Sequence, residues 1–176
     1  MTQTPVDQEA LESEALYGVS DELLEHIRDA LENDQETQVF ELVESLHAAD
    51  IADIIYQLAS GSREKFVKTI EPIFDADILR DVRDSVRKDV VEALSIETIA
   101  RSIAELESDD AVSIMEDLDD DQKEEILRAM PKSERALVEK SLSYPEGSAG
   151  RLMQREMVCV PPFWTVGEAT DFIRDT

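Results

Sequence analysis

The stretch "LHAADIADIIYQLASGSREKFVKTI", residues 46–70, carries an apolar residue at every twelfth position. The same interval continues down the chain and gives nine apolar anchors: Leu46, Leu58, Ile70, Val82, Leu94, Leu106, Leu118, Met130 and Leu142. The residues three and four positions before each anchor are apolar as well, with Ser102 and Glu139 as the exceptions. Apolar residues spaced by three and four are typical of one face of an amphipathic helix.

The interval of twelve predicts that this helix is interrupted in every repeat. An α-helix turns ~100° per residue, so twelve residues overshoot three full turns by ~120°. A continuous helix would therefore wind its apolar stripe around all sides, and we expect breaks at 59–62 with Gly61, Pro72, Ser95, 107–110, 119–121 and Pro131. Two such units would form a hairpin of about 24 residues, and stacked hairpins would form an all-α solenoid. An irregular helical bundle is the alternative.

The two ends of the chain have a different character. Residues 1–18 are polar and aperiodic, which predicts a flexible tail. Ser20 is a suitable N-cap for a helix that presents apolar residues at helical spacing, Leu23, Leu24, Ile27 and Leu31. At the other end, "YPEGSAGRLM" (144–153) interrupts the helices with proline and glycine, so we predict a linker over 144–155.

After the linker the pattern changes to that of an α/β unit. "MVCV" (157–160) is apolar and β-branched, which indicates a strand, and two prolines end it. Thr165 is then a candidate cap for a helix over "VGEATDFIRDT". A strand followed by a helix is half of an α/β unit, so a truncated second domain is expected here.

The charge of the chain restricts its partners. Among 176 residues there are 42 Asp and Glu against 17 Lys and Arg, a net charge of -25. Such a surplus repels phosphate, which argues against nucleic acid and against direct contact with an anionic membrane. It favours a basic partner or divalent cations. The N-terminus lacks the features of a signal peptide, and no apolar run of ~18 residues exists, so we expect no membrane span within this chain.

Residues that could carry chemistry are few. Cys159 is the single cysteine, so no disulfide is expected, and a thiol in the predicted strand is expected to be buried. His26 and His47 lie on different predicted helices without metal-ligand spacing, and His47 is expected at a helix end. No phosphate loop or nucleophile arrangement is present, so we do not expect an enzyme.

Acidic residues gather between 109 and 125, at Asp109, Asp110, Glu116, Asp117, Asp119, Asp120, Asp121, Glu124 and Glu125. A solvated helical face accounts for such a cluster, because carboxylates in the first turn of a helix are favourable. Oxygen ligands for Mg²⁺, with most of its coordination completed by water, are the other interpretation. The EF-hand pattern of a tight calcium site is absent.

Three stretches resemble the MgtE family of magnesium transporters: "LHAADIADIIYQL" (46–58), "ELESDDAVSIMEDL" (105–118) and above all "YPEGSAGRLMQREMVCVPPFWTVGEA" (144–169). The resemblance implies that 19–143 form a helical N domain, a right-handed superhelical solenoid. It implies that 156–176 are the first strand and helix of a truncated CBS domain. Its expected partners are the protein's own CBS and transmembrane domains, in a homodimer at the cytoplasmic face of the bacterial inner membrane.

The resemblance also implies a function and a set of ligands. Mg²⁺ bound between the N domain and the CBS domains would favour a compact, closed-pore arrangement. The family's acidic ligands fall on Asp77 and Asp109, and a backbone carbonyl ligand falls on Arg151. A third acidic position is Ser113 here, where Asp110 could substitute in part. The second hypothesis is an acidic protein-interaction scaffold that resembles the helical domains of flagellar motor switch proteins and binds a basic partner.

Overall fold

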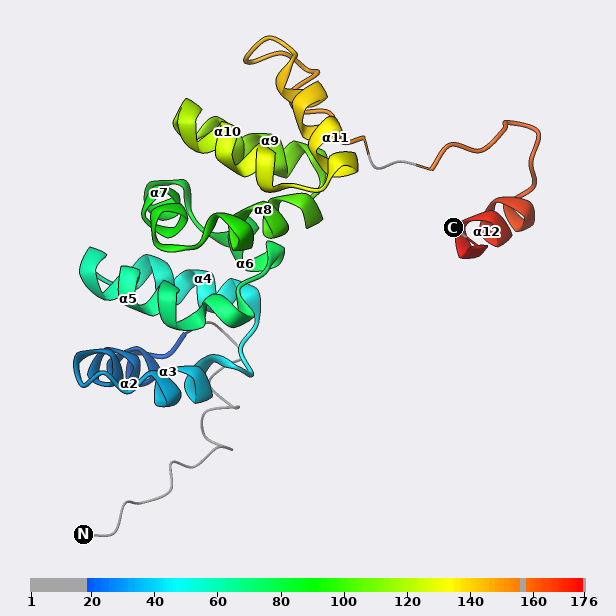
Figure 1. Cartoon of the computed structure of the whole chain (residues 1–176). Helices are drawn as coiled ribbons and strands as arrows, with labels where there is room; N and C mark the ends of the chain where they lie inside the picture. Colours follow the sequence, from blue (N-terminus) through cyan, green and yellow to red (C-terminus); the bar gives the residue numbers. More distant parts are fainter. Residues whose placement is uncertain (1–18, 156–157, 176) are drawn as a thin grey trace.

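The computed structural model describes residues 19–155 and 158–175, and all regular structure within these ranges is helical (Figure 1). The α-helices are α2 (Asp21–Glu32), α3 (Glu36–Val43), α4 (Ala48–Gln57), α5 (Ser60–Ile70), α6 (Ala76–Asp81), α7 (Asp84–Ala93), α8 (Ile96–Glu105), α9 (Ser108–Glu116), α10 (Asp120–Ala129), α11 (Lys132–Leu142) and α12 (Val166–Asp175), with the 3₁₀ turn η2 (Glu71–Ile73) after α5. The all-α prediction for 19–143 is therefore confirmed. The tail predicted for 1–18 lies outside the described residues.

Short extended connectors separate successive helices. After α4, Leu58 (φ -80°, ψ 144°) and Ala59 (φ -66°, ψ 153°) are both extended, and α5 begins at the next residue. The amide of Leu58 still donates to Ile54 O at 3.1 Å, so the anchor completes the preceding helix while it turns the chain. The break expected over 59–62 is found at its first residue, because the buried anchor Leu58 and Ala59 make the turn, and Gly61 already lies in the first turn of α5.

Four other connectors follow the same plan. Val82, Leu94, Leu106 and Met130 are extended C-caps, and the residue after each is the extended N-cap of the next helix. Ser95 and Pro131 are such N-caps, and Pro72 lies in η2, so the breaks predicted at these three residues are confirmed. Ser20 caps α2, and its hydroxyl accepts from the amide of Leu23 at 3.2 Å.

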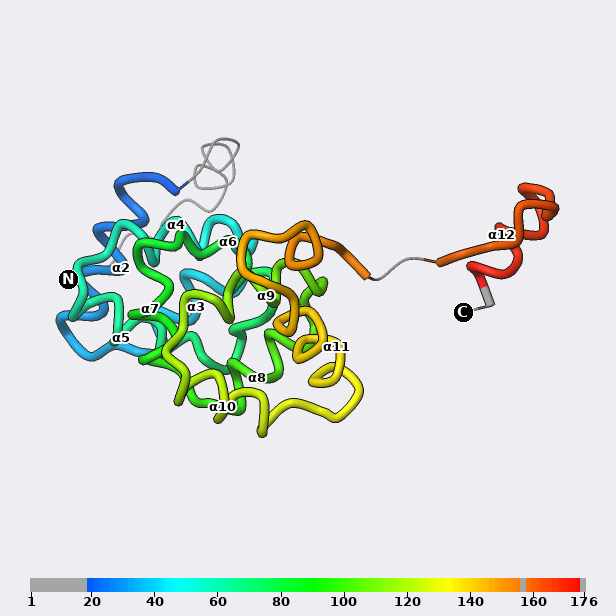
Figure 2. The backbone as a smooth tube through the Cα atoms, turned by 90° about the horizontal axis from the view of Figure 1, so that it is seen from above, coloured from blue at the N-terminus to red at the C-terminus, as the bar shows by residue number. Residues whose placement is uncertain are grey.

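The helices pack mainly on their next-but-one neighbours. The main contacts join α4 to α6, α6 to α8 and α8 to α10, and a second set joins α3 to α5, α5 to α7 and α9 to α11. Figures 1 and 2 show the resulting stack from α2 and α3 to α11, with α12 apart from it in both views. Each unit consists of one helix and one connector. This pairing is expected when the connectors return the chain so that each helix packs beside the helix two units before it. The right-handed superhelical solenoid stays a prediction.

The core is made of the repeated apolar positions. Every apolar residue at the anchor positions and at three and four before them is buried or half-buried. The two exceptions in the pattern behave differently: Glu139 is exposed, whereas Ser102 is completely buried in α8 and its hydroxyl has no hydrogen-bond partner among the described residues. A buried hydroxyl without a partner costs free energy, so Ser102 is a weak point in an otherwise apolar core.

Two arginines 24 residues apart connect adjacent helices in the same way. Arg63 and Arg87 each occupy the fourth position of their helix and donate through Nη2 to the carbonyl of the preceding anchor, Leu58 (2.8 Å) and Val82 (3.3 Å). Through Nη1, Arg63 pairs with Asp89 in α7, and Arg87 pairs with Asp117 at the end of α9. These pairs join α5 to α7 and α7 to α9.

The segment after the linker differs from the prediction. The expected strand is not found over 158–160, which are irregular and exposed, while 157 lies outside the described residues. A strand needs a neighbouring strand for its backbone hydrogen bonds, and none is found in the described part of the chain. Cys159 is accordingly exposed, so the prediction of a buried thiol is wrong. The predicted helix is confirmed as α12, with Thr165 Oγ1 accepting from the Glu168 amide at 3.3 Å.

Glu71 connects η2 to the start of α8. One carboxylate oxygen accepts from the backbone amide of Ser95 at 3.0 Å, from its hydroxyl, and from Thr98 Oγ1 at 2.9 Å. The hydrogen bond from the Ser95 hydroxyl is the main reason why the pKa of Glu71 lies below its ordinary value of 4.5. The carboxylate therefore stabilises the folded state only while it is ionised.

We expect Ser102→Ala to stabilise the protein. The substitution removes a buried hydroxyl without a partner and raises helix propensity, so the free energy of unfolding should rise by about 1 kcal/mol or more. Ser85→Ala, at an exposed position in α7, is the matched control because it raises helix propensity without removing a buried hydroxyl. Urea unfolding of both variants measures the difference, and an equal effect at the two positions would contradict the interpretation.

We expect Glu71→Gln to destabilise the protein in a pH-dependent way. A carboxyl whose folded pKa is lowered contributes stability above its unfolded pKa and loses it as pH falls through the folded pKa. The difference in unfolding free energy between wild type and Glu71→Gln should be constant at neutral pH and shrink below pH 4.5. Urea unfolding from neutral to acidic pH measures it, and a difference independent of pH would refute the role of ionised Glu71.

Candidate functional site

The first turn of α9 places two candidate ligands next to each other. Glu107 is the extended N-cap, so Asp109 and Asp110 both fall in the first turn, where the free amides and the helix dipole favour negative charge. Both residues are half-buried. Oδ1 of Asp109 is fully buried and has no hydrogen-bond partner among the described residues. An ionised oxygen in this position is costly unless a cation neutralises it.

Asp77 and Ser113, the residues at the family's other two acidic positions, are more exposed. Asp77 lies in the first turn of α6, and its Oδ1 accepts from Arg80 Nη1 at 2.7 Å in an exposed ion pair. Ser113 is exposed on α9, one turn after Asp109. Among the described residues, no group of three or more His, Cys, Asp or Glu side chains is arranged to hold a metal. The structure thus brings Asp109 and Asp110 together and does not gather Asp77 with them into such a group.

The linker, 144–155, is folded into consecutive turns around Tyr144. The amide of Ser148 donates to Pro145 O at 3.1 Å, and the amide of Arg151 donates to Ser148 O at 3.0 Å. Gly147 has φ +70°, in the left-handed region that favours glycine. A Cβ at Gly150 would lie 2.6 Å from ring carbons of Tyr144, so only glycine allows this approach.

Two arginines fasten the linker to the stack. Arg151 donates from Nε to Tyr144 O at 2.7 Å and from Nη1 to Glu116 Oε1, at the end of α9, at 2.6 Å. The amide of Arg155 donates to Ser108 Oγ in α9 at 3.0 Å, and its Nε donates to Ser141 Oγ in α11 at 3.0 Å.

The guanidinium of Arg155 also lies 5.2 Å from the centre of the Tyr144 ring. Its hydrogen bond and charge lower the pKa of the Tyr144 phenol. The linker therefore docks on α9 and α11, beside the helix that carries Asp109.

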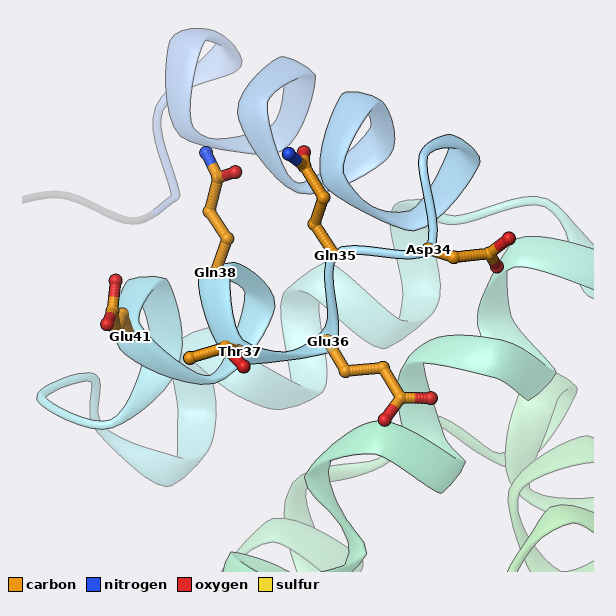
Figure 3. Close-up of a pocket in the computed structure, with 6 residues that line it drawn as sticks. All are labelled: Asp34, Gln35, Glu36, Thr37, Gln38 and Glu41. Atoms are coloured by element: carbon orange, nitrogen blue, oxygen red, sulfur yellow. The ribbon is translucent and has the colours of Figure 1, made fainter.

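An open depression between α2 and α3 also carries several carboxylates. It is lined by Asp34, Gln35, Glu36, Thr37, Gln38 and Glu41. Figure 3 shows that the three carboxylates point in different directions, and Asp34 is paired with Lys65. The side chains do not converge on one point, so this depression does not have the arrangement of a metal site.

Several contacts at the site were not predicted from the sequence. The partners of Arg151 and Arg155 lie as far as 47 residues away, and no interval in the sequence indicates them. The one available signal was the occurrence of two arginines in the glycine-containing segment of a strongly acidic chain. His47 is the N-cap of α4, which confirms its expected place at a helix end.

These observations define a class: an acidic, all-helical domain of twelve-residue units with a basic linker docked on its final helices. The family described as the MgtE intracellular N domain matches residues 46–147, and the chain belongs to this family. In the described part of the chain, every helix is too short or too polar to span a lipid bilayer.

Comparison with solved structures supports the fold. The crystal structure of the soluble part of a magnesium transporter matches with a TM-score of 0.66 and 23% sequence identity. The match covers 88% of this chain and 61% of that one, so this chain spans about three-fifths of its length. No curated protein matches the chain.

We expect Gly150→Ala to release the linker without unfolding the stack. The added Cβ would overlap the Tyr144 ring, and moving the ring would disturb its contact with Arg155. Trypsin should then cleave after Arg151 and Arg155 about tenfold faster or more, because cleavage follows the population of the locally open state. Gly61→Ala is the control, since nothing lies within 4 Å of its Cβ. Unchanged cleavage in Gly150→Ala would show that the close approach is not needed for docking.

Proposed function

We propose that this chain is a cytoplasmic regulatory domain of a magnesium transporter and senses Mg²⁺ through the acidic start of α9. The observation that carries the proposal is the buried, unpartnered Oδ1 of Asp109, in a member of the MgtE intracellular N domain family. Asp110 is its neighbour in the same turn and forms no ion pair with another described residue. Asp77 and the backbone carbonyl of Arg151 complete the proposed ligand set.

The residues fit the requirements of this ion. Mg²⁺ takes oxygen ligands and commonly uses one or two protein carboxylates, with water in its other positions, so a cluster of three acidic side chains is not required. The carbonyl of Arg151 accepts no hydrogen bond from the other described residues, and it is free to act as a ligand. Asp77 would have to leave Arg80, but an exposed ion pair of this kind contributes little.

The charge of the chain supplies the physical mechanism. A net charge of -25 disfavours close approach of another acidic surface. A dication that binds one domain arrangement better than another shifts the population toward it by mass action. We propose that Mg²⁺ favours a compact arrangement with the protein's own CBS and transmembrane domains, and that loss of Mg²⁺ releases it. In this proposal the chain has no catalytic activity.

The proposed setting follows from the family. Residues 156–176 would be the start of a CBS domain, and the whole protein would be a homodimer at the cytoplasmic face of the bacterial inner membrane. The exposed apolar side chains of α12, among them Val166 and Ile173, agree with a helix that packs on a further part of such a domain. The acidic interaction scaffold remains the alternative, with a basic protein in place of Mg²⁺.

We expect millimolar MgCl₂ to raise the melting temperature of the chain above its value in EDTA at matched ionic strength. The gain should be lost in Asp109→Asn, because the substitution removes the charge that the ion neutralises. Glu92→Gln is the control: Glu92 is an exposed carboxylate on α7 outside the proposed ligand set, and the variant should keep the gain. Thermal unfolding followed by circular dichroism measures the shift. A response to MgCl₂ no larger than the response to KCl would favour the scaffold instead.

A further inference from the structure

We propose that the linker, 144–155, is a latch, and that Arg151 acts as a tethered cation that closes it on α9. The latch sets where the chain leaves the helical stack, since the linker is the last part of the chain docked on the stack before the segment that carries α12. When the latch opens, the following segment gains freedom while the stack remains folded. The inference is a conformational device within this chain, and its central claim does not depend on Mg²⁺.

The surroundings of Arg151 support this role. Its side chain is only 12% exposed, although it carries a full charge. The charge is neutralised by Glu116, whose side chain is 40% exposed, and Nε is bound by the carbonyl of Tyr144. Charge-assisted hydrogen bonds of this length are stronger than neutral ones, and a largely buried arginine without its partner would be destabilising. Glu116 is also the last residue of α9, where the helix dipole favours a cation.

Polar contacts dominate the docking of the linker. Leu152 and Met153, its large apolar side chains, are 78% and 42% exposed. The linker is also absent from the buried core, which is formed by the repeated positions up to Val138. Segments with few buried apolar contacts open at a lower free energy than the core, so the linker can detach while the helices stay packed.

The second fastening point acts in the same direction. The amide of Arg155 binds Ser108 Oγ, and Nε of Arg155 binds Ser141 Oγ, both at 3.0 Å. The carboxylate partner of Arg151 is Glu116, so Arg151 is a position at which a change of charge should open the latch.

Hydrogen exchange of the full chain in EDTA tests the latch. Arg151→Gln removes the charge and should accelerate amide exchange across 148–155 by about tenfold or more, while the amides of α2 to α11 keep their rates. Glu116→Gln should act in the same direction, and Arg151→Lys should give an intermediate rate because it retains the charge but not the forked geometry.

Arg135→Gln is the matched control. Arg135 forms a looser pair with Glu139 on α11, 3.7 Å apart, and its loss should leave the linker unchanged. The latch is refuted if Arg151→Gln leaves exchange across 148–155 unchanged. It is also refuted if the amides of the stack accelerate by the same factor, since the linker would then open only by global unfolding.

A second arm uses the same variant with MgCl₂ and rests on the proposed function. If Mg²⁺ binds α9 and the linker carbonyl, it should slow exchange across 148–155 again in Arg151→Gln, but not in Arg151→Gln combined with Asp109→Asn. Faster exchange in EDTA without recovery in MgCl₂ would retain the latch and count against magnesium sensing. Equal exchange in Arg151→Gln and wild type in EDTA would reject the latch, whatever Mg²⁺ does.

Discussion

The extended connector with its buried anchor is the constraint on which the rest of the structure depends. Twelve residues of continuous helix would rotate the apolar stripe by ~120°, so the chain must reset the direction of that stripe once in every unit. An anchor such as Leu58 does so by leaving the helix while its side chain remains in the core. The packing of next-but-one helices, and the place of Arg63 and Arg87 beside the anchor carbonyls, both follow from this turn.

Much of this fold could be predicted from the sequence because the core repeats. The interval of twelve predicted the helices and the buried residues of its own pattern, but other core residues, such as Phe74 and Ile99, lie outside that pattern. It placed the break after Leu58 within 59–62, and periodicity could not locate the break more closely, because a buried C-cap and a buried helical residue give the same apolar signal. The prediction of a strand around Cys159 failed for another reason. β-propensity identifies residues suited to a sheet, whereas a strand forms only beside a neighbouring strand.

The candidate site was predictable only in part. The resemblance indicated Asp77 and Asp109, with Asp110 as a partial substitute at a third position. The shared first turn of Asp109 and Asp110 follows from the local helix start, whereas Asp77 lies on α6. The pairing of Arg151 with Glu116, 35 residues apart, depends on how the linker folds back over α9. Tertiary packing brings these residues together, and no local pattern in the sequence encodes their contact. The positive charge of Arg151 acquires a structural role only through this contact with Glu116.

The placement of the cations supports the proposal that the start of α9 is the point of regulation. The chain has few basic residues, and three arginines connect separate elements: Arg63 joins α5 to α7, Arg87 joins α7 to α9, and Arg151 joins the linker to α9. The carboxylate partner in each of these pairs is neutralised by the arginine. The buried oxygen of Asp109 has no such partner among the described residues, although it lies on the same helix as Glu116. A cation from solution has the largest effect where the chain leaves a desolvated charge unmatched, and the docked linker lies on the same helix, so it can be affected by that binding.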